Sequence, residues 1–364
     1  MKLVASVSPG ELRVVAWDGS LQDYAISRPG APDGVDDLHR GRITARVPAM
    51  AGAFVALDGA EGFLPDSEGA AGEGTILGVR ITRAAQGGKG PRLSARLTPD
   101  DAALVGNGPP ALLRRGPDAL ARLIQRYPDV PIVIDDAGTA ARCGRHARVV
   151  TRAFDDDIEA AVAALAEPRA MLPGGASMSV HPTPALVAID IDLGANSAER
   201  RAKSASQRDA NRALIPALAR QIRLRNLSGA ILVDLGGMQA RARSALAPDF
   251  VRALANDPLA PRFLGFSALG LAEILRPRIH PPLHELLAGP HAAGLAALRT
   301  LAREIAATPA RAPLLRASAA VVDALKHDSA ALLAIAERCG RALPLIEDRS
   351  LPENGWSLED TPRG

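Results

Sequence analysis

The sequence is poor in cysteine, in aromatic residues and in lysine, and it has no long apolar run. Its two cysteines, Cys143 and Cys339, lie far apart and outside any CxxC motif, which excludes a disulfide framework and a four-cysteine zinc site. The N-terminal residues form no apolar core of signal-peptide length, and no window approaches the roughly 20 apolar residues of a membrane span. We therefore expect a reduced, cytoplasmic protein that does not contact membranes.

The remaining composition is that of a globular protein with a sizeable core. The 364 residues are 47% hydrophobic and 23% charged, which allows two or three domains at about 150 residues each. Arginine supplies almost all of the positive charge, because lysine occurs only at positions 2, 89, 203 and 326. The formal net charge of +3 and the pI near 9.2 permit a nucleic-acid partner without requiring one.

The N-terminal part of the chain predicts short strands separated by glycine-rich turns. Residues 2–7 and 11–17 are β-prone and flank a Ser-Pro-Gly turn, which predicts a hairpin. Further short runs predict a small antiparallel barrel; they span residues 41–48, 51–57, 62–64, 74–83 and 91–97.

From about residue 100 the pattern changes to alternating helices and strands. Such alternation with apolar strands is typical of a parallel or mixed α/β sheet. The expected helices span residues 112–126, 156–166, 204–225, 240–256 and 269–276, and the expected strands span residues 130–134, 186–192, 230–235 and 263–267. Beyond His284 the sequence predicts mainly helix up to Cys339, then a strand at 342–346 and a polar tail.

Three aspartates end two of the apolar strands. Side chains alternate along a strand, so Asp190 and Asp192 point to one face, and Asp234 ends the next predicted strand. Carboxylates that meet at the carboxyl end of a sheet are costly to bury unless a cation holds them, and magnesium prefers such oxygen ligands. The alternative is that each aspartate only caps the following turn or helix.

Two phenylalanines, Phe54 and Phe63, lie on predicted barrel strands. They can fill the barrel core, which the pattern alone favours, or they can stack against bases on an RNA-binding face. Basic residues near them in the sequence would serve the second role; they are Arg42, Arg46, Lys89 and Arg92.

Four motifs together resemble the ribonuclease E/G family of bacterial endoribonucleases. The third is the most specific, and the match covers roughly residues 1–285. The motifs are GRITARVP with GAFVALDG and GFLP in residues 41–65, LPGGAS leading into ALVAID in residues 172–190, ARQIRLRNLSGAILVD in residues 219–234, and GLAEILRPR in residues 270–278.

The resemblance implies a multidomain α+β and α/β fold. An OB-fold barrel is inserted in a ribonuclease-H-like domain, and a deoxyribonuclease-I-like α/β catalytic domain and a mostly helical C-terminal part follow. The implied boundaries are residues 1–36 for the N-terminal hairpin, 37–98 for the OB fold, 99–184 for a reduced sensor and ribonuclease-H-like region, 185–285 for the catalytic domain and 286–364 for a small C-terminal domain.

The resemblance also implies the site and its chemistry. Asp190 and Asp234 match the aspartates that hold a catalytic Mg²⁺, which would activate water for attack on the phosphodiester. Cleavage of single-stranded RNA would leave a 5′-phosphate and a 3′-hydroxyl. Phe54 and Phe63 match aromatic RNA-contacting positions, which reverses the core interpretation, and Lys89 matches a basic one.

Several positions depart from the family pattern. Asp192 replaces the usual asparagine, and Ala268-Leu269 replaces an Arg-Phe pair. The sequence contains no equivalent of the Arg-Thr pair that senses a 5′-monophosphate. It also lacks the CPxCxG zinc motif, so any homo-oligomer forms without a zinc link.

We therefore expect a magnesium-dependent endoribonuclease with weak or no 5′-end sensing. The departures at Asp192 and Ala268 support an alternative, an RNA-binding protein of the same family that has lost catalysis. A third hypothesis is a metal-dependent phosphoesterase for another class of substrate.

Overall fold

The protein is represented by a computed structural model, and the structure is described for residues 1–194, 204–236, 238–308 and 313–360. Contacts divide the chain into two compact units. The first comprises residues 1–81, 92–159 and 284–364, and the second comprises residues 82–91 and 160–283. No helix in the described ranges is both long enough and apolar enough to span a bilayer.

The first unit begins with a five-stranded sheet in the order β11-β10-β1-β2-β3. Strands β1, β2 and β3 are antiparallel neighbours, so the predicted hairpin is confirmed, while β10 and β11 run parallel to β1. Helix α2 packs its buried Leu120 and Leu123 on this sheet. The elements are β1 (Lys2–Ser8), β2 (Glu11–Trp17), β3 (Leu21–Ser27), α2 (Ala119–Arg126), β10 (Ile132–Ile134), α3 (Ala137–Arg142), β11 (Ala147–Val149) and α4 (Asp156–Ala163).

A closed barrel lies between β3 and α2 in the sequence. Strand β4 pairs with both β5 and β7, which closes the order β4-β5-β6-β8-β7 into a five-stranded barrel, and β9 adds to the edge of β4. The predicted small barrel is therefore confirmed, although β6 and β8 pair in parallel. The elements are β4 (Leu38–Val47), β5 (Gly52–Ala56), β6 (Glu61–Pro65), β7 (Ile76–Arg83), β8 (Arg92–Ser94), α1 (Pro99–Val105) and β9 (Ala111–Arg114).

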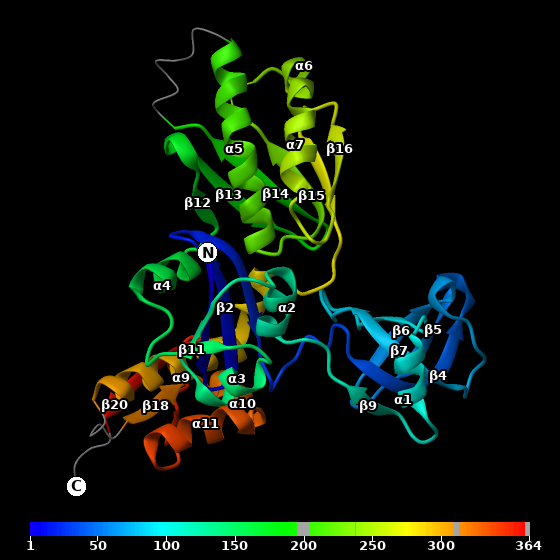
Figure 1. The fold of residues 1–364 in the computed structure, drawn as a ribbon, viewed down its shortest axis with the longest axis vertical. Coiled ribbons are helices and arrows are strands. Elements are labelled where there is room, and N and C mark those ends of the chain that lie inside the picture. The colour runs from blue at the N-terminus through cyan, green and yellow to red at the C-terminus, as the bar shows by residue number, and fades with distance from the viewer. Residues whose placement is uncertain (195–203, 237, 309–312, 361–364) are drawn as a thin grey trace. The chain divides into compact units, whose positions relative to one another are not determined.

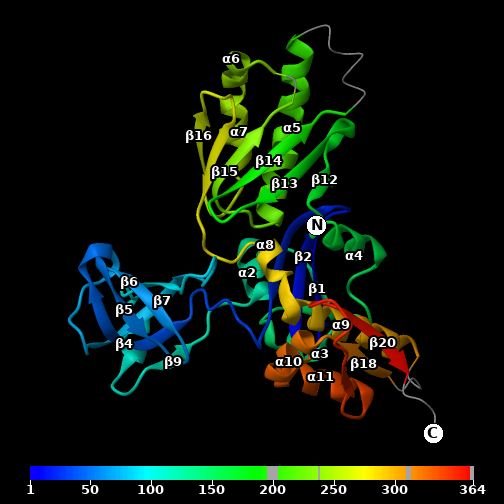
Figure 2. The same cartoon turned by 180° about the vertical axis from the view of Figure 1, so that it is seen from behind.

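The C-terminal part of the first unit combines helices with a three-stranded sheet in the order β19-β18-β20 (Figure 2). Leu298, Leu301 and Leu325 from the helices pack on Leu315 of the sheet. Strands β18 and β20 lie where helix and polar tail were expected. The elements are α8 (Leu283–Leu286), α9 (Gly289–Ala307), β18 (Pro313–Ala317), α10 (Ala319–His327), α11 (Ser329–Cys339), β19 (Leu345–Glu347) and β20 (Trp356–Asp360).

The second unit is built on a six-stranded sheet in the order β12-β13-β14-β15-β17-β16. Strands β14 and β15 are parallel, and helices α5 and α7 pack on one face of the sheet (Figure 1). The elements are β12 (Arg169–Met171), β13 (Ser177–Pro182), β14 (Leu186–Asp192), α5 (Ser204–Leu224), β15 (Gly229–Asp234), α6 (Ala240–Arg243), α7 (Ala247–Leu254), β16 (Arg262–Phe266) and β17 (Ala272–Arg276).

Two of the helix predictions are wrong over much of their length. Residues 111–114 form β9 instead of helix, because the helix begins only after Asp118, whose side chain caps it by accepting from the Ala121 N–H at 2.8 Å. The Gly-Pro pair at 116–117 precedes that cap. The predicted helix 269–276 is strand β17, whose residues alternate between buried and partly exposed and pair with β15.

The predicted helix 240–256 is present but is divided into α6 and α7.

The second unit begins earlier than the catalytic domain that the sequence suggests. Strands β12 and β13 are hydrogen-bonded into the same sheet as β14, so residue 185 lies within one continuous sheet. The contact division groups residues 160–184 with residues 185–283, together with residues 82–91.

Candidate functional site

The three aspartates lie on one exposed face of the β14–β15 pair. Asp190 is directly opposite Asp234 in the parallel register, and Asp192 lies two residues further along β14. Ile189 and Ile191 alternate with these aspartates and are buried against the helices. Because adjacent strands are about 4.8 Å apart, the Asp190 and Asp234 carboxylates are neighbours on this face.

An arginine on α6 holds Asp234. The Arg243 Nη1 donates to Asp234 Oδ1 at 2.9 Å and to the carbonyl of Gly270 at 2.7 Å, while its Nε donates to the Met238 carbonyl at 3.1 Å. The Arg243 side chain is only 11% exposed, whereas that of Asp234 is 53% exposed. The guanidinium is therefore fixed beside one member of the aspartate pair.

Asp192 has different partners. Its Oδ1 accepts from the Gly194 N–H at 2.9 Å, and its Oδ2 lies 4.0 Å from Arg169 Nη2. Asp192 thus caps the turn after β14, which is the structural role that the sequence left open for such an aspartate.

The Asp190–Asp234 pair suits a hydrated divalent cation. Magnesium is commonly held by one or two carboxylates, with waters and substrate phosphates as its other ligands. In the part of the chain that the structure describes, no three His, Cys, Asp or Glu side chains gather into a complete metal cluster. Asp190 and Asp234 are directly opposite each other and would be the pair that such a cation uses, whereas Asp192 accepts from the Gly194 N–H and Arg243 shares an oxygen of Asp234.

The two barrel phenylalanines lie on the outer surface of the barrel. Phe54 and Phe63 are directly opposite each other on β5 and β6, with ring centroids 5.7 Å apart and an edge-to-face angle of 70°. Their neighbours Ala53, Val55 and Leu64 fill the barrel core. Both rings are half-buried, so the core-filling interpretation is wrong.

Basic residues flank these rings on the same barrel face. Arg42 on β4 pairs with Ala56, which lies on the Phe54 side of β5, and Arg92 on β8 pairs with Phe63. Both arginines are exposed. Arg46 instead forms an ion pair with Asp66 at 2.8 Å.

Lys89 belongs to a different unit from the phenylalanines. It is an exposed residue of the tight turn in which Gln86 and Lys89 exchange backbone hydrogen bonds. Among the contacts that the structure describes, none connects Lys89 to the aromatic pair.

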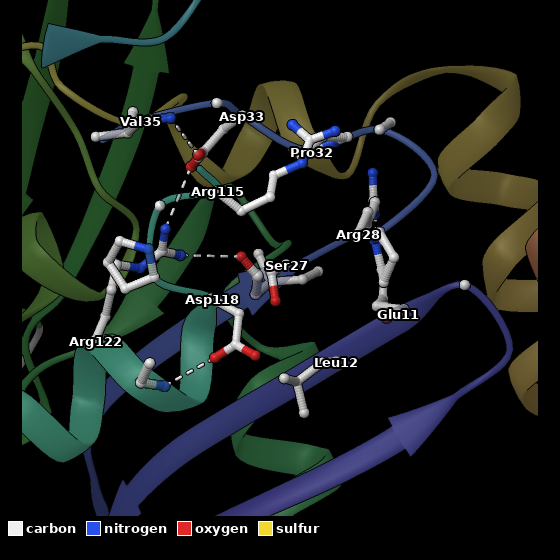
Figure 3. A pocket seen from close by; sticks show the side chains of 18 of the residues that line it. Glu11, Leu12, Ser27, Arg28, Pro32, Asp33, Val35, Arg115, Asp118 and Arg122 are labelled. Atoms are coloured by element: carbon white, nitrogen blue, oxygen red, sulfur yellow. Dashed lines mark hydrogen bonds and ion pairs between the residues drawn. The ribbon is translucent and has the colours of Figure 1, made fainter. Parts of the chain in front are cut away.

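A cavity of about 610 Å³ lies where two connections to the barrel meet, at residues 28–37 and 115–118 (Figure 3). Its charged groups bind one another. Arg115 Nη1 is 2.6 Å from Asp37, and Arg122 Nη1 is 3.4 Å from Asp33. The Arg115–Asp37 pair joins the two connections, and the Arg122–Asp33 pair joins the first of them to α2, which gives these charges a structural role.

Sequence reasoning missed Arg243. The residue follows Asp234 closely in the chain, but many arginines surround it and nothing in its spacing marks it. The contact of Arg243 with Asp234 depends on the tertiary fold: Arg243 ends the short helix α6, and its guanidinium also donates to the carbonyl of Gly270.

The match to a protein family lies mainly in the second unit. Residues 143–279, which include all three aspartates, match the ribonuclease E/G family. The chain is similar to a protein named Ribonuclease E from Nostoc sp., at 34% identity over 134 residues, which is 35% of this chain and 19% of the relative.

Two proteins named Ribonuclease G are also similar. The one from Escherichia coli (strain K12) is 31% identical over 132 residues, or 36% of this chain and 27% of the relative. The one from Salmonella typhimurium (strain SL1344) is 30% identical over 195 residues, or 50% of this chain and 40% of the relative. The chain thus spans less than half the length of each of these relatives.

Proposed function

We propose that this chain, which belongs to the ribonuclease E/G family, is a magnesium-dependent endoribonuclease that cleaves single-stranded RNA with little dependence on the 5′ end. One observation carries the proposal. Asp190 and Asp234 are opposite each other on an exposed sheet face, inside the segment that matches the family.

Asp190 and Asp234 would hold the ion. When bound there, Mg²⁺ supplies an activated water and offsets negative charge on the scissile phosphate. Arg243 orients the Asp234 carboxylate through its hydrogen bond to Oδ1 and is itself held by two backbone carbonyls. Asp192, anchored to the Gly194 N–H, adds negative charge next to the pair.

The barrel would bind the substrate. Exposed aromatic rings stack on unpaired bases irrespective of sequence, and nearby arginines neutralise phosphates. Phe54 and Phe63 present two rings on one barrel face, and Arg42 and Arg92 lie at its sides. This combination favours single strands, whose bases are free to stack.

The test is magnesium-dependent cleavage of a fluorescent A/U-rich oligonucleotide. Asp234→Asn removes one ligand charge while keeping the side-chain shape, and we expect cleavage to fall by at least about 100-fold, because charge stabilisation at a reacting phosphate is worth several kcal/mol. Asp209→Asn is the matched control, since Asp209 is an exposed aspartate on α5. Equal cleavage by wild type and Asp234→Asn contradicts the proposal.

A second candidate is an RNA-binding protein without catalysis. The Arg243–Asp234 ion pair favours it, because a guanidinium already occupies an oxygen that the ion would use. This candidate predicts salt-dependent RNA binding and no turnover with any divalent metal. Cleavage of a phosphodiester other than RNA would instead favour a phosphoesterase of another class.

A further inference from the structure

A second cavity, of about 820 Å³, lies in the first unit, and neither the three aspartates nor the aromatic pair belongs to its lining. It opens at the carboxyl ends of three parallel strands: Ser8 ends β1, Asp135 follows β10, and Thr151 follows β11. Ligands of α/β sheets commonly bind at this edge. The C-terminal half of α9 forms another wall.

The cavity is lined by more basic than acidic groups. Of the residues that the structure describes there, the arginines are Arg152, Arg299, Arg303 and Arg338, and the carboxylates are Asp135 and Glu159. Arg299 and Arg303 project from α9, and Arg338 comes from α11. The local excess of positive charge is costly where these groups are withdrawn from water.

The nearby carboxylates are shared among several arginines and do not remove this excess. The buried Glu11 binds Arg299 Nη1 at 2.6 Å and also Arg28 at 3.1 Å. Glu159 binds both Arg13 and Arg303, and Arg152 pairs at 2.5 Å with Asp156, whose side chain is 91% exposed.

The carboxylate of Asp135 accepts hydrogen bonds from backbone N–H groups. Its two oxygens accept from the N–H groups of Val7 and Ala153, at 2.7 and 3.3 Å. It therefore orders the ends of the strands at the cavity edge.

Burial lowers the pKa of the Arg299 and Arg303 guanidinium groups, and for Arg303 the neighbouring charges of Arg13 and Arg152 lower it further. A bound anion would offset this repulsion. Guanidinium groups are also well suited to phosphate, because their planar donors bind its oxygens in pairs.

We propose that this cavity binds a small phosphate-bearing anion of nucleotide size or less. Its volume falls within the usual range of about 300–1,000 Å³ for small-ligand sites. Arg152, in the loop after β11, and Arg303, on α9, both line the cavity, and their side chains are 53% and 46% exposed, which leaves them accessible to an anion. Ala302, Ile305 and Ala306 provide an apolar wall for the rest of the ligand.

The experiment is calorimetric titration of the full chain with inorganic pyrophosphate and, separately, with ADP. We expect saturable one-to-one binding of at least one of them. Arg303→Gln and Arg152→Gln should each weaken it about tenfold, which corresponds to roughly 1.4 kcal/mol for one charge-assisted hydrogen bond. Arg349→Gln is the control, since Arg349 is 90% exposed and lies outside the cavity lining.

Three outcomes overturn the proposal: no saturable binding of either probe, equal affinity in the cavity variants and the wild type, or displacement of the probe by a short RNA oligonucleotide. A thermal melt of each variant identifies loss of fold, and Arg152→Gln, on an exposed loop, keeps the test available if Arg303→Gln does not fold. RNA cleavage should be unchanged in both variants. A failure of the anion-binding proposal can therefore be distinguished from a failure of the proposed endoribonuclease activity.

Discussion

At the scale of single residues, Arg243 is the charged neighbour that bears most directly on the proposed magnesium site. Its guanidinium donates to Asp234 Oδ1 at 2.9 Å and is nine-tenths buried, so its charge acts through a medium that screens less than water. A cation that binds the pair must overcome this repulsion. At the proposed magnesium site, the arginine would therefore lower the affinity for the ion while it orients the Asp234 carboxylate.

Replacement of Arg243 should therefore raise the affinity for magnesium. We expect Arg243→Gln to bind Mg²⁺ severalfold more tightly than wild type in isothermal titration calorimetry, because one neighbouring positive charge is gone. Arg252→Gln, an arginine of α7 with a 73% exposed side chain, serves as the control. An unchanged affinity in Arg243→Gln would show that the ion pair does not compete with the metal.

At the scale of elements, the alternation of apolar and polar residues predicted strand β14 most reliably. The predicted strand 186–192 coincides with β14, because buried and exposed residues alternate along it without interruption. Residues 272–276 lack that signal in the sequence, because Leu275 is exposed and Arg276 is buried, and pairing with β15 decides their conformation. Strand β18 was missed because it is a short buried run between helices.

Local sequence also does not determine which side chains from distant segments contact one another. The Asp190–Asp234 pairing follows from one strand register that simple βαβ reasoning anticipates. The Arg243 contact depends on tertiary folding, and so does the basic cavity, whose arginines come from residues 152–338. The outward position of Phe54 and Phe63 was predicted by family resemblance, whereas the pattern alone favoured the core.

The barrel strands β5 and β6 yield a prediction for RNA binding. Phe63→Ala should weaken binding of a single-stranded oligonucleotide about tenfold, since stacking on an aromatic side chain contributes about 1–3 kcal/mol per base. Fluorescence anisotropy at fixed salt measures this, with a thermal melt to check the fold. Leu104→Ala on α1, where Leu104 is 51% exposed, is the control. Unaltered affinity in Phe63→Ala would exclude the aromatic pair from the interface.

At the scale of the whole molecule, the first unit should lose stability in mild acid. Burial is the main cause that lowers the pKa of His39 in barrel strand β4 and of His284 in α8. The unfolded chain therefore binds more protons than the folded chain just below the ordinary histidine pKa of about 6.5. The loss of stability therefore begins as the pH falls below about 6.5 and is complete once the pH lies below the lowered pKa values of the folded chain.

Urea unfolding of the full chain at several pH values between 7.5 and about 5 measures this loss. The free energy of unfolding should decrease toward the acid end, and His39→Gln should flatten the decrease, because glutamine stays neutral throughout the range. His327→Gln is the control, since the His327 side chain is 78% exposed and no burial accompanies it. If His39→Gln keeps the full pH dependence of wild type, protonation of the barrel histidine does not govern acid stability.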